Sequence, residues 1–201
     1  MSTAILGSST ALARTLAEGL GAHLCGADTV SLPQDTTGVV IVVGADPMPH
    51  ESSTGSASDE DWRRLTEEPM RRTLVALQRS WSVMAGRGGR IVLVTPNIGM
   101  VGARHLVPYT TALEGIRAMT KSAARQWASS SDIVVNTIAA PLPLFAPDMR
   151  GSAGHLTAAA VPDDDNLVRS IISTLEFLLH TESRHVVGAT ILVDGGALML
   201  P

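Results

Sequence analysis

The sequence is poor in cysteine and in aromatic residues. Its 201 residues include one cysteine, Cys25, so a disulfide bond within the chain is excluded and a reducing compartment is the simple expectation. Phenylalanine, tryptophan and tyrosine together make up only 3% of the residues. A hydrophobic core must therefore be built mainly from aliphatic side chains.

Basic clusters and long apolar runs are also lacking. The net charge is −4 and no run of Lys or Arg exceeds two residues, so nucleic-acid binding has no electrostatic basis. The longest apolar runs hold about seven residues, whereas a membrane-spanning helix needs ~20. The N-terminal residues lack the pattern of a signal peptide, and the six histidines show no paired metal-ligand spacing. We expect a cytoplasmic protein without metal, nucleic acid or membrane partners.

The sequence instead alternates apolar, β-prone runs with amphipathic helical segments. Apolar residues make up 45% and charged residues 17%, which is typical of a globular protein. The pattern predicts strands over residues 3–7, 22–25, 38–44, 90–95, 132–138 and 190–193, and helices over 8–20, 59–85, 108–128 and 163–180. Continuous apolar strands between helices favour a parallel sheet with helices on both faces. We expect one α/β domain over residues 1–201.

Local signals mark several helix ends. Ser8 or Ser9 is expected to cap the first helix and Gly21 to close it. Ser58 or Asp59 is expected to cap the second, which Pro69 should break or restart. Three acidic residues, 163–165, fall in the predicted first turn of the last helix, where the helix dipole favours negative charge.

Four segments carry a resemblance to a known family. They are GRIVLVTPNIGMVG (89–102), Tyr109, TKSAARQWASSSDIVVNTIA (120–139) and VVGATILVDGGALM (186–199), preceded by SDEDWRRL (58–65). In this order and spacing they resemble the short-chain dehydrogenase/reductase family. The resemblance implies a Rossmann-like, doubly wound parallel sheet in three αβα layers. It also implies a relationship to enzymes that reduce ketones or oxidise alcohols with NAD or NADP.

The catalytic set of that family is Asn–Ser–Tyr–Lys, and the resemblance places only its tyrosine here. Tyr109 stands at the Tyr position, while Leu113 replaces the Lys and Pro96 replaces the Ser. Pro69 falls at or near the Asn position. A phenol has an ordinary pKa near 10, and without a neighbouring cation it is no base near neutral pH. We therefore expect Tyr109 to be vestigial.

The cofactor motifs of the family are depleted as well. Its glycine-rich turn is LGSSTALA (6–13) here and retains only Gly7, which we interpret as an ordinary strand-to-helix turn. Between Leu24 and Gly38 the chain is too short for a crossover helix and a further strand. The fold is therefore expected to be truncated between the family's second and third strands. We expect no bound cofactor.

These observations favour a non-catalytic subunit. The resemblance implies that helices 70–85 and 109–128, together with the C-terminal helix and strand, form assembly surfaces. We expect the chain to pair through them with an active relative, one that acts on 3-hydroxyacyl or 3-ketoacyl thioesters. A homo-oligomer built through the same surfaces is an alternative.

Two other functions stay open. The chain could be an NAD(P)-dependent oxidoreductase with an atypical site around Tyr109, in which Thr95 replaces the Ser and Lys121 or Arg117 replaces the Lys. It could also be a small-ligand-binding module that uses the cleft at the carboxyl ends of the strands.

Overall fold

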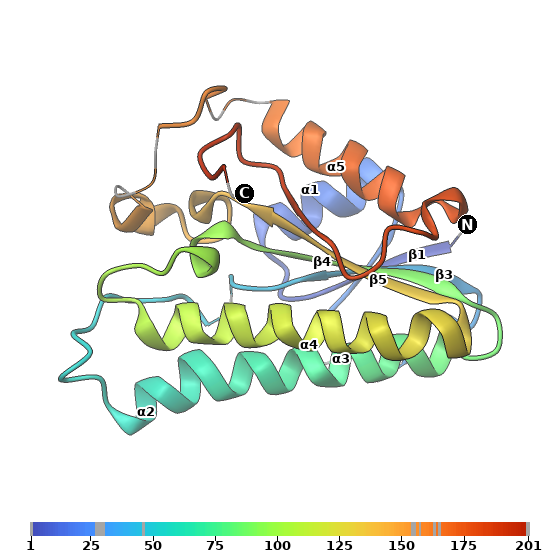
Figure 1. The fold of residues 1–201 in the computed structure, drawn as a ribbon, viewed down its shortest axis with the longest axis horizontal. Coiled ribbons are helices and arrows are strands. Elements are labelled where there is room, and N and C mark those ends of the chain that lie inside the picture. The colour runs from blue at the N-terminus through green and yellow to red at the C-terminus, as the bar shows by residue number, and fades with distance from the viewer. Residues whose placement is uncertain are drawn as a thin grey trace.

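The computed structural model describes residues 2–26, 31–45, 47–153, 156, 158–162, 164 and 166–199, and arranges them in three layers (Figure 1). Among these residues, six parallel strands form one sheet in the order β2-β1-β3-β4-β5-β6. The strands are β1 (Ser2–Leu6), β2 (His23–Cys25), β3 (Thr36–Val42), β4 (Gly89–Pro96), β5 (Ile133–Ala140) and β6 (Thr190–Leu192). The main helices are α1 (Ala11–Leu20), α3 (Glu68–Met84), α4 (Val107–Ser131) and α5 (Asn166–Leu179).

The sheet is buried on both faces, as its continuous apolar strands predict. Ile41 of β3 belongs to the core beneath α3 and α4, and its neighbour Val40 belongs to the core beneath α1 and α5. Successive side chains of a strand point to opposite faces, so each apolar strand contributes to both cores. Figure 1 shows α1 and α5 on one side of the sheet and α3 and α4 on the other. The expected Rossmann-like, doubly wound architecture is confirmed.

The first helix begins later than its sequence indicated. Thr10 is the N-cap of α1 and its hydroxyl accepts the Ala13 N–H at 3.2 Å, so the expectation of a cap at Ser8 or Ser9 is wrong. Thr10 has the extended backbone that a capping residue needs. Gly21 closes the helix in a left-handed conformation, as expected.

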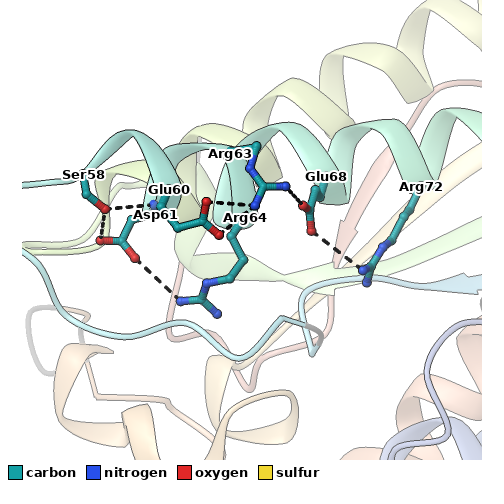
Figure 2. Close-up of polar contacts among 7 residues, drawn as sticks. All are labelled: Ser58, Glu60, Asp61, Arg63, Arg64, Glu68 and Arg72. Carbon is teal, nitrogen blue, oxygen red and sulfur yellow. Dashed lines mark hydrogen bonds and ion pairs between the residues drawn. The ribbon is translucent and has the colours of Figure 1, made fainter.

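Pro69 lies in the first turn of a new α-helical segment, as the expectation of a restart predicts, and the helical path is not interrupted. Ser58 caps α2 (Asp59–Trp62), a π-helical turn follows at Arg63–Glu67, and α3 continues from Glu68. A proline lacks an N–H and its ring crowds the carbonyl of the preceding turn, and the wider π turn relieves that crowding. Ion pairs run along the outside of this helix, with the Arg63 guanidinium between Glu60 and Glu68 (Figure 2).

The last helix also starts later than predicted. α5 begins at Asn166, whose backbone N–H is accepted by the Asp164 carboxylate at 2.8 Å. Asp164 therefore lies just outside the helix. The expectation for Asp163 and Asp165 lies outside the described residues.

The connection from β2 to β3 crosses β1 within residues 26–35. β2 and β3 lie on opposite sides of β1, and β2 is an edge of the sheet among the described residues. Leu32 lies in this connection, is 6% exposed and packs into the core beneath α3 and α4. A further parallel strand would need a crossover of about a dozen residues or more. The expected truncation at this point agrees with the observed topology.

The described residues contain no helix long and apolar enough to cross a membrane. Within the same residues, no group of three or more His, Cys, Asp or Glu side chains is placed to hold a metal ion.

A buried amide fixes the segment that leads into β6, and its removal should destabilise the fold. Asn136 of β5 donates to the Val186 carbonyl at 2.6 Å and accepts the Ala189 N–H at 2.9 Å. Asn136→Ala leaves both backbone groups unpaired, so we expect the free energy of unfolding to fall by about 2–4 kcal/mol in urea titrations. Ser130→Ala, at an exposed position of α4, is the control and should change it by less than about 0.5 kcal/mol. A loss below about 1 kcal/mol for Asn136→Ala would contradict this role.

Candidate functional site

Tyr109 lies in the first turn of α4 and is buried. Its side chain is 3% exposed, and its hydroxyl donates a hydrogen bond to the Gly44 carbonyl at 2.6 Å. Gly44 follows the carboxyl end of β3, so the bond ties the start of α4 to that end of the sheet. The phenol faces a backbone carbonyl of its own chain.

Gly44 allows this close contact because it has no side chain. Its φ is +97°, a conformation that residues with a Cβ rarely adopt. A Cβ built there would lie 2.6 Å from Cδ of Pro96 and 3.0 Å from the Tyr109 hydroxyl. Pro96, which stands at the position of the family's serine, therefore packs directly over Gly44. Gly44, Pro96 and Tyr109, which are distant in the sequence, therefore pack against one another here.

Leu113 lies one turn after Tyr109 and is 4% exposed. Together with Tyr109 it belongs to a small apolar cluster at the carboxyl end of the sheet, which we call the Tyr109 cluster: Ile98, Leu106, Tyr109, Leu113, Leu142 and Ala146. Burial in these surroundings raises the pKa of Tyr109 well above its ordinary value. The shift is opposite to the one that a catalytic base near neutral pH requires.

The structure shows which partners the residues of the atypical site that we considered have. The single hydroxyl proton of Tyr109 is donated to Gly44, while Thr95 is a buried residue of β4. Arg117 is hydrogen-bonded to the Glu114 carboxylate at 2.9 Å, and Lys121 is exposed on α4.

Pro69 and Gly7 lie apart from the Tyr109 cluster and line a neighbouring cleft. A Cβ at Gly7 would lie 2.9 Å from the Val42 carbonyl oxygen. The close approach of the residue after β1 to the end of β3 is therefore sufficient to explain a glycine at this position.

The same cleft contains two residues that the sequence analysis missed. Arg72 and Arg79 of α3 line it opposite the turn at Gly7 and Ser8. Their seven-residue spacing puts them on one side of the helix, and this spacing was the available signal. Because arginine residues and a strand-to-helix turn line the cleft, the residue types present fit the phosphate-bearing part of a nucleotide. When bound, a nicotinamide nucleotide supplies hydride transfer.

Solved structures of similar fold correct one expectation. A gluconate 5-dehydrogenase from Burkholderia cenocepacia, in complex with NADP and tartrate, matches with a TM-score of 0.73 and 19% identity over 98% of this chain and 94% of its own. The angucycline C-6 ketoreductase LanV, with bound NADP, matches with a TM-score of 0.72 and 19% identity over 98% and 95% of the two chains. The expectation that no cofactor binds is therefore wrong, because the fold is one that holds NADP in both structures.

Sequence comparison identifies the family. The family model described as enoyl-(acyl carrier protein) reductase matches residues 34–197. The short-chain dehydrogenase/reductase eriH of Hericium erinaceus is 29% identical over 86% of this chain and 69% of its own length. The 3-oxoacyl-[acyl-carrier-protein] reductase FabG of Vibrio harveyi is 29% identical over 71% of this chain, which spans only 59% of the FabG length. The chain belongs to the short-chain dehydrogenase/reductase family.

Proposed function

We propose that the chain is a non-catalytic subunit that assembles with an active short-chain dehydrogenase/reductase as a structural or regulatory partner. The observation that carries the proposal is the hydrogen bond from Tyr109 to the Gly44 carbonyl inside an apolar cluster. A phenol held in this way stays protonated. With Leu113 and Pro96 beside it, neither a cation to lower its pKa nor a serine hydroxyl to hold a substrate oxygen is supplied at the family's positions.

The α3–α4 side of the molecule supports assembly with a partner. Leu74 and Trp81 of α3 are 43% and 40% exposed, and their seven-residue spacing puts them on one side of the helix. A Cβ at Gly115 of α4 would lie 2.7 Å from Met70 of α3, so the two helices pack closely and present one surface. Exposed apolar side chains grouped in this way are typical of protein–protein contact sites.

The partner that we propose acts on 3-hydroxyacyl or 3-ketoacyl thioesters. Support comes from FabG of Vibrio harveyi, whose name gives it activity on a 3-oxoacyl-[acyl-carrier-protein]. In such an assembly the buried contact would stabilise the active subunit by mass action.

Tyr109 should resist ionisation in the native protein. It is the single tyrosine of the sequence, so its titration can be followed by ultraviolet absorbance of tyrosinate. We expect no signal from the native protein at about pH 11, whereas the urea-unfolded chain should titrate near the ordinary value of about 10. Native titration below about pH 10 would contradict the proposal, because the phenol would then be accessible as a base.

The same burial predicts a pH dependence of stability. Folding raises the pKa of Tyr109, so the neutral phenol contributes to the free energy of unfolding. This contribution is complete below the unfolded pKa of about 10 and is lost as the pH rises above it. Above about pH 10, the free energy of unfolding should therefore fall more steeply with pH in the wild type than in Tyr109→Phe. The difference between the two slopes should reach about 1.4 kcal/mol per pH unit. Parallel curves for the two proteins in urea titrations would be the contrary result.

Assembly can be tested by co-expression with an active relative that keeps the Ser–Tyr–Lys set and is encoded beside this chain. We expect the two chains to co-purify as one oligomer in size-exclusion chromatography with light scattering. Trp81→Asp should weaken the association at least about tenfold, because it puts a charge into a buried apolar contact. Ser82→Asp, on the outer face of the same helix, is the matched control and should leave it unchanged.

Separate elution of the two wild-type chains would contradict the proposed partnership. A homo-oligomer that is equally sensitive to Trp81→Asp would keep the surface but replace the partner with a second copy of this chain.

A further inference from the structure

Three consecutive residues between β3 and α2 are each bonded to a different part of the chain. The Ser52 N–H donates to the His105 carbonyl, shortly before α4, at 2.9 Å. The Ser152 hydroxyl donates to the Glu51 carboxylate at 2.6 Å, across 101 positions of the sequence. The third residue, His50, is bonded to side chains of the helix that begins with α2. We call these three residues the strap, because they connect segments that are distant in the sequence.

The ring of His50 uses both of its nitrogen atoms. Nδ1 is 2.9 Å from the Arg64 guanidinium, which can only donate, so this nitrogen accepts the hydrogen bond. The proton of the neutral ring is then on Nε2, which lies 3.1 Å from the Asp61 carboxylate and donates to it. Figure 2 shows the same carboxylate joined to Ser58 and to Arg64. One end of the strap is therefore held by two groups of the helix that leads into α3.

The other two bonds of the strap reach segments that contact the Tyr109 cluster. His105 directly precedes Leu106, a member of that cluster that is 1% exposed. Ser152 belongs to the 3₁₀-helical segment Pro147–Ala153, whose Met149 packs against the same cluster. The strap therefore bonds to two segments that contribute side chains to the surroundings of the phenol.

The backbone of His105 is strained. Its φ is +66°, in the left-handed region that residues other than glycine rarely adopt. Strained backbone persists where surrounding contacts impose it, and the hydrogen bond from Ser52 is one such contact. When this bond breaks, the segment before α4 can relax to a more favourable conformation.

The strap is weakly held compared with the sheet beneath it. His50 and Glu51 are exposed, and the bond between Glu51 and Ser152 lies at the surface. Bonds between exposed side chains contribute little to stability, since water competes for the same groups. All residues of β4 and β5, in contrast, are buried. Segments that are held mainly by exposed bonds open locally while the buried core stays folded.

We propose that the strap is a conformational device that controls access to Tyr109. In the closed state, its bonds hold the segments at His105 and Ser152 against the Tyr109 cluster. Opening of the strap releases both segments and exposes the phenol while the sheet stays folded. The inference does not rest on the proposed non-catalytic role, because the strap would control access to Tyr109 in the same way in a catalytic and a non-catalytic chain.

Nitration by tetranitromethane measures this opening in the full chain without any assay of activity. The reagent attacks an accessible phenolate, and Tyr109 is the single tyrosine of the sequence. Mass spectrometry of the peptide that contains Tyr109 separates its nitration from oxidation of Cys25. The native wild type should react much more slowly than the urea-unfolded chain, because the phenol is buried. Low concentrations of urea should change the native rate little, since local opening exposes little surface.

His50→Ala combined with Glu51→Ala removes the side-chain bonds of the strap. We expect nitration of Tyr109 to be at least about fivefold faster in this double variant, because one hydrogen bond changes an equilibrium about two- to tenfold. Glu51→Gln keeps an acceptor oxygen for Ser152, so it should react at the wild-type rate. Thr54→Ala, at an exposed position of the same loop, is the matched control and should also keep that rate.

Three results would overturn the proposal. They are equal nitration rates in the wild type and the double variant, an equal acceleration in Thr54→Ala, and a rate that rises with urea as steeply as global unfolding does. Circular dichroism shows whether each variant is folded. If the double variant does not fold, Glu51→Ala alone should still react faster than Glu51→Gln, and equal rates for these two variants would contradict the role of the strap.

Discussion

The buried hydrogen bond between Tyr109 and the Gly44 carbonyl organises the carboxyl end of the sheet. It joins the start of α4 to the segment that follows β3. It can form because Gly44 has no Cβ, which would collide with Pro96 and with the Tyr109 hydroxyl. Once the hydroxyl is paired and surrounded by aliphatic side chains, the neutral form is strongly favoured over the phenolate. A residue that family members use for proton transfer is here held as part of the packing.

The two flanks of α3 differ in the side chains that they carry. One flank carries the exposed apolar residues Leu74 and Trp81, whereas the other carries Arg72 and Arg79 and borders the cleft. The diameter of the helix separates the two flanks.

Much of the architecture follows from local patterns, and the exceptions have physical causes. The order of strands and helices follows from apolar periodicity, since each run must bury its apolar side. Helix starts were less well predicted. Thr10 caps α1 in place of the two serines before it. It directly precedes Ala11, where the helix begins, and it has the extended backbone of a capping residue. Pro69 stays within a helix because a preceding π turn makes room for its ring, and no sequence pattern indicates that turn.

The sequence by itself determined the family, the parallel sheet and the identities of Leu113 and Pro96 at two catalytic positions, since these depend on residue types in linear order. The tertiary structure alone decided that the Tyr109 hydroxyl meets Gly44, 65 positions away, and that Gly7 shares a cleft with Arg72 and Arg79. It also supplied the fold likeness that overturned the expectation of a chain without a cofactor. Contacts between distant segments depend on how helices pack against the sheet, and that packing is a property of the whole chain.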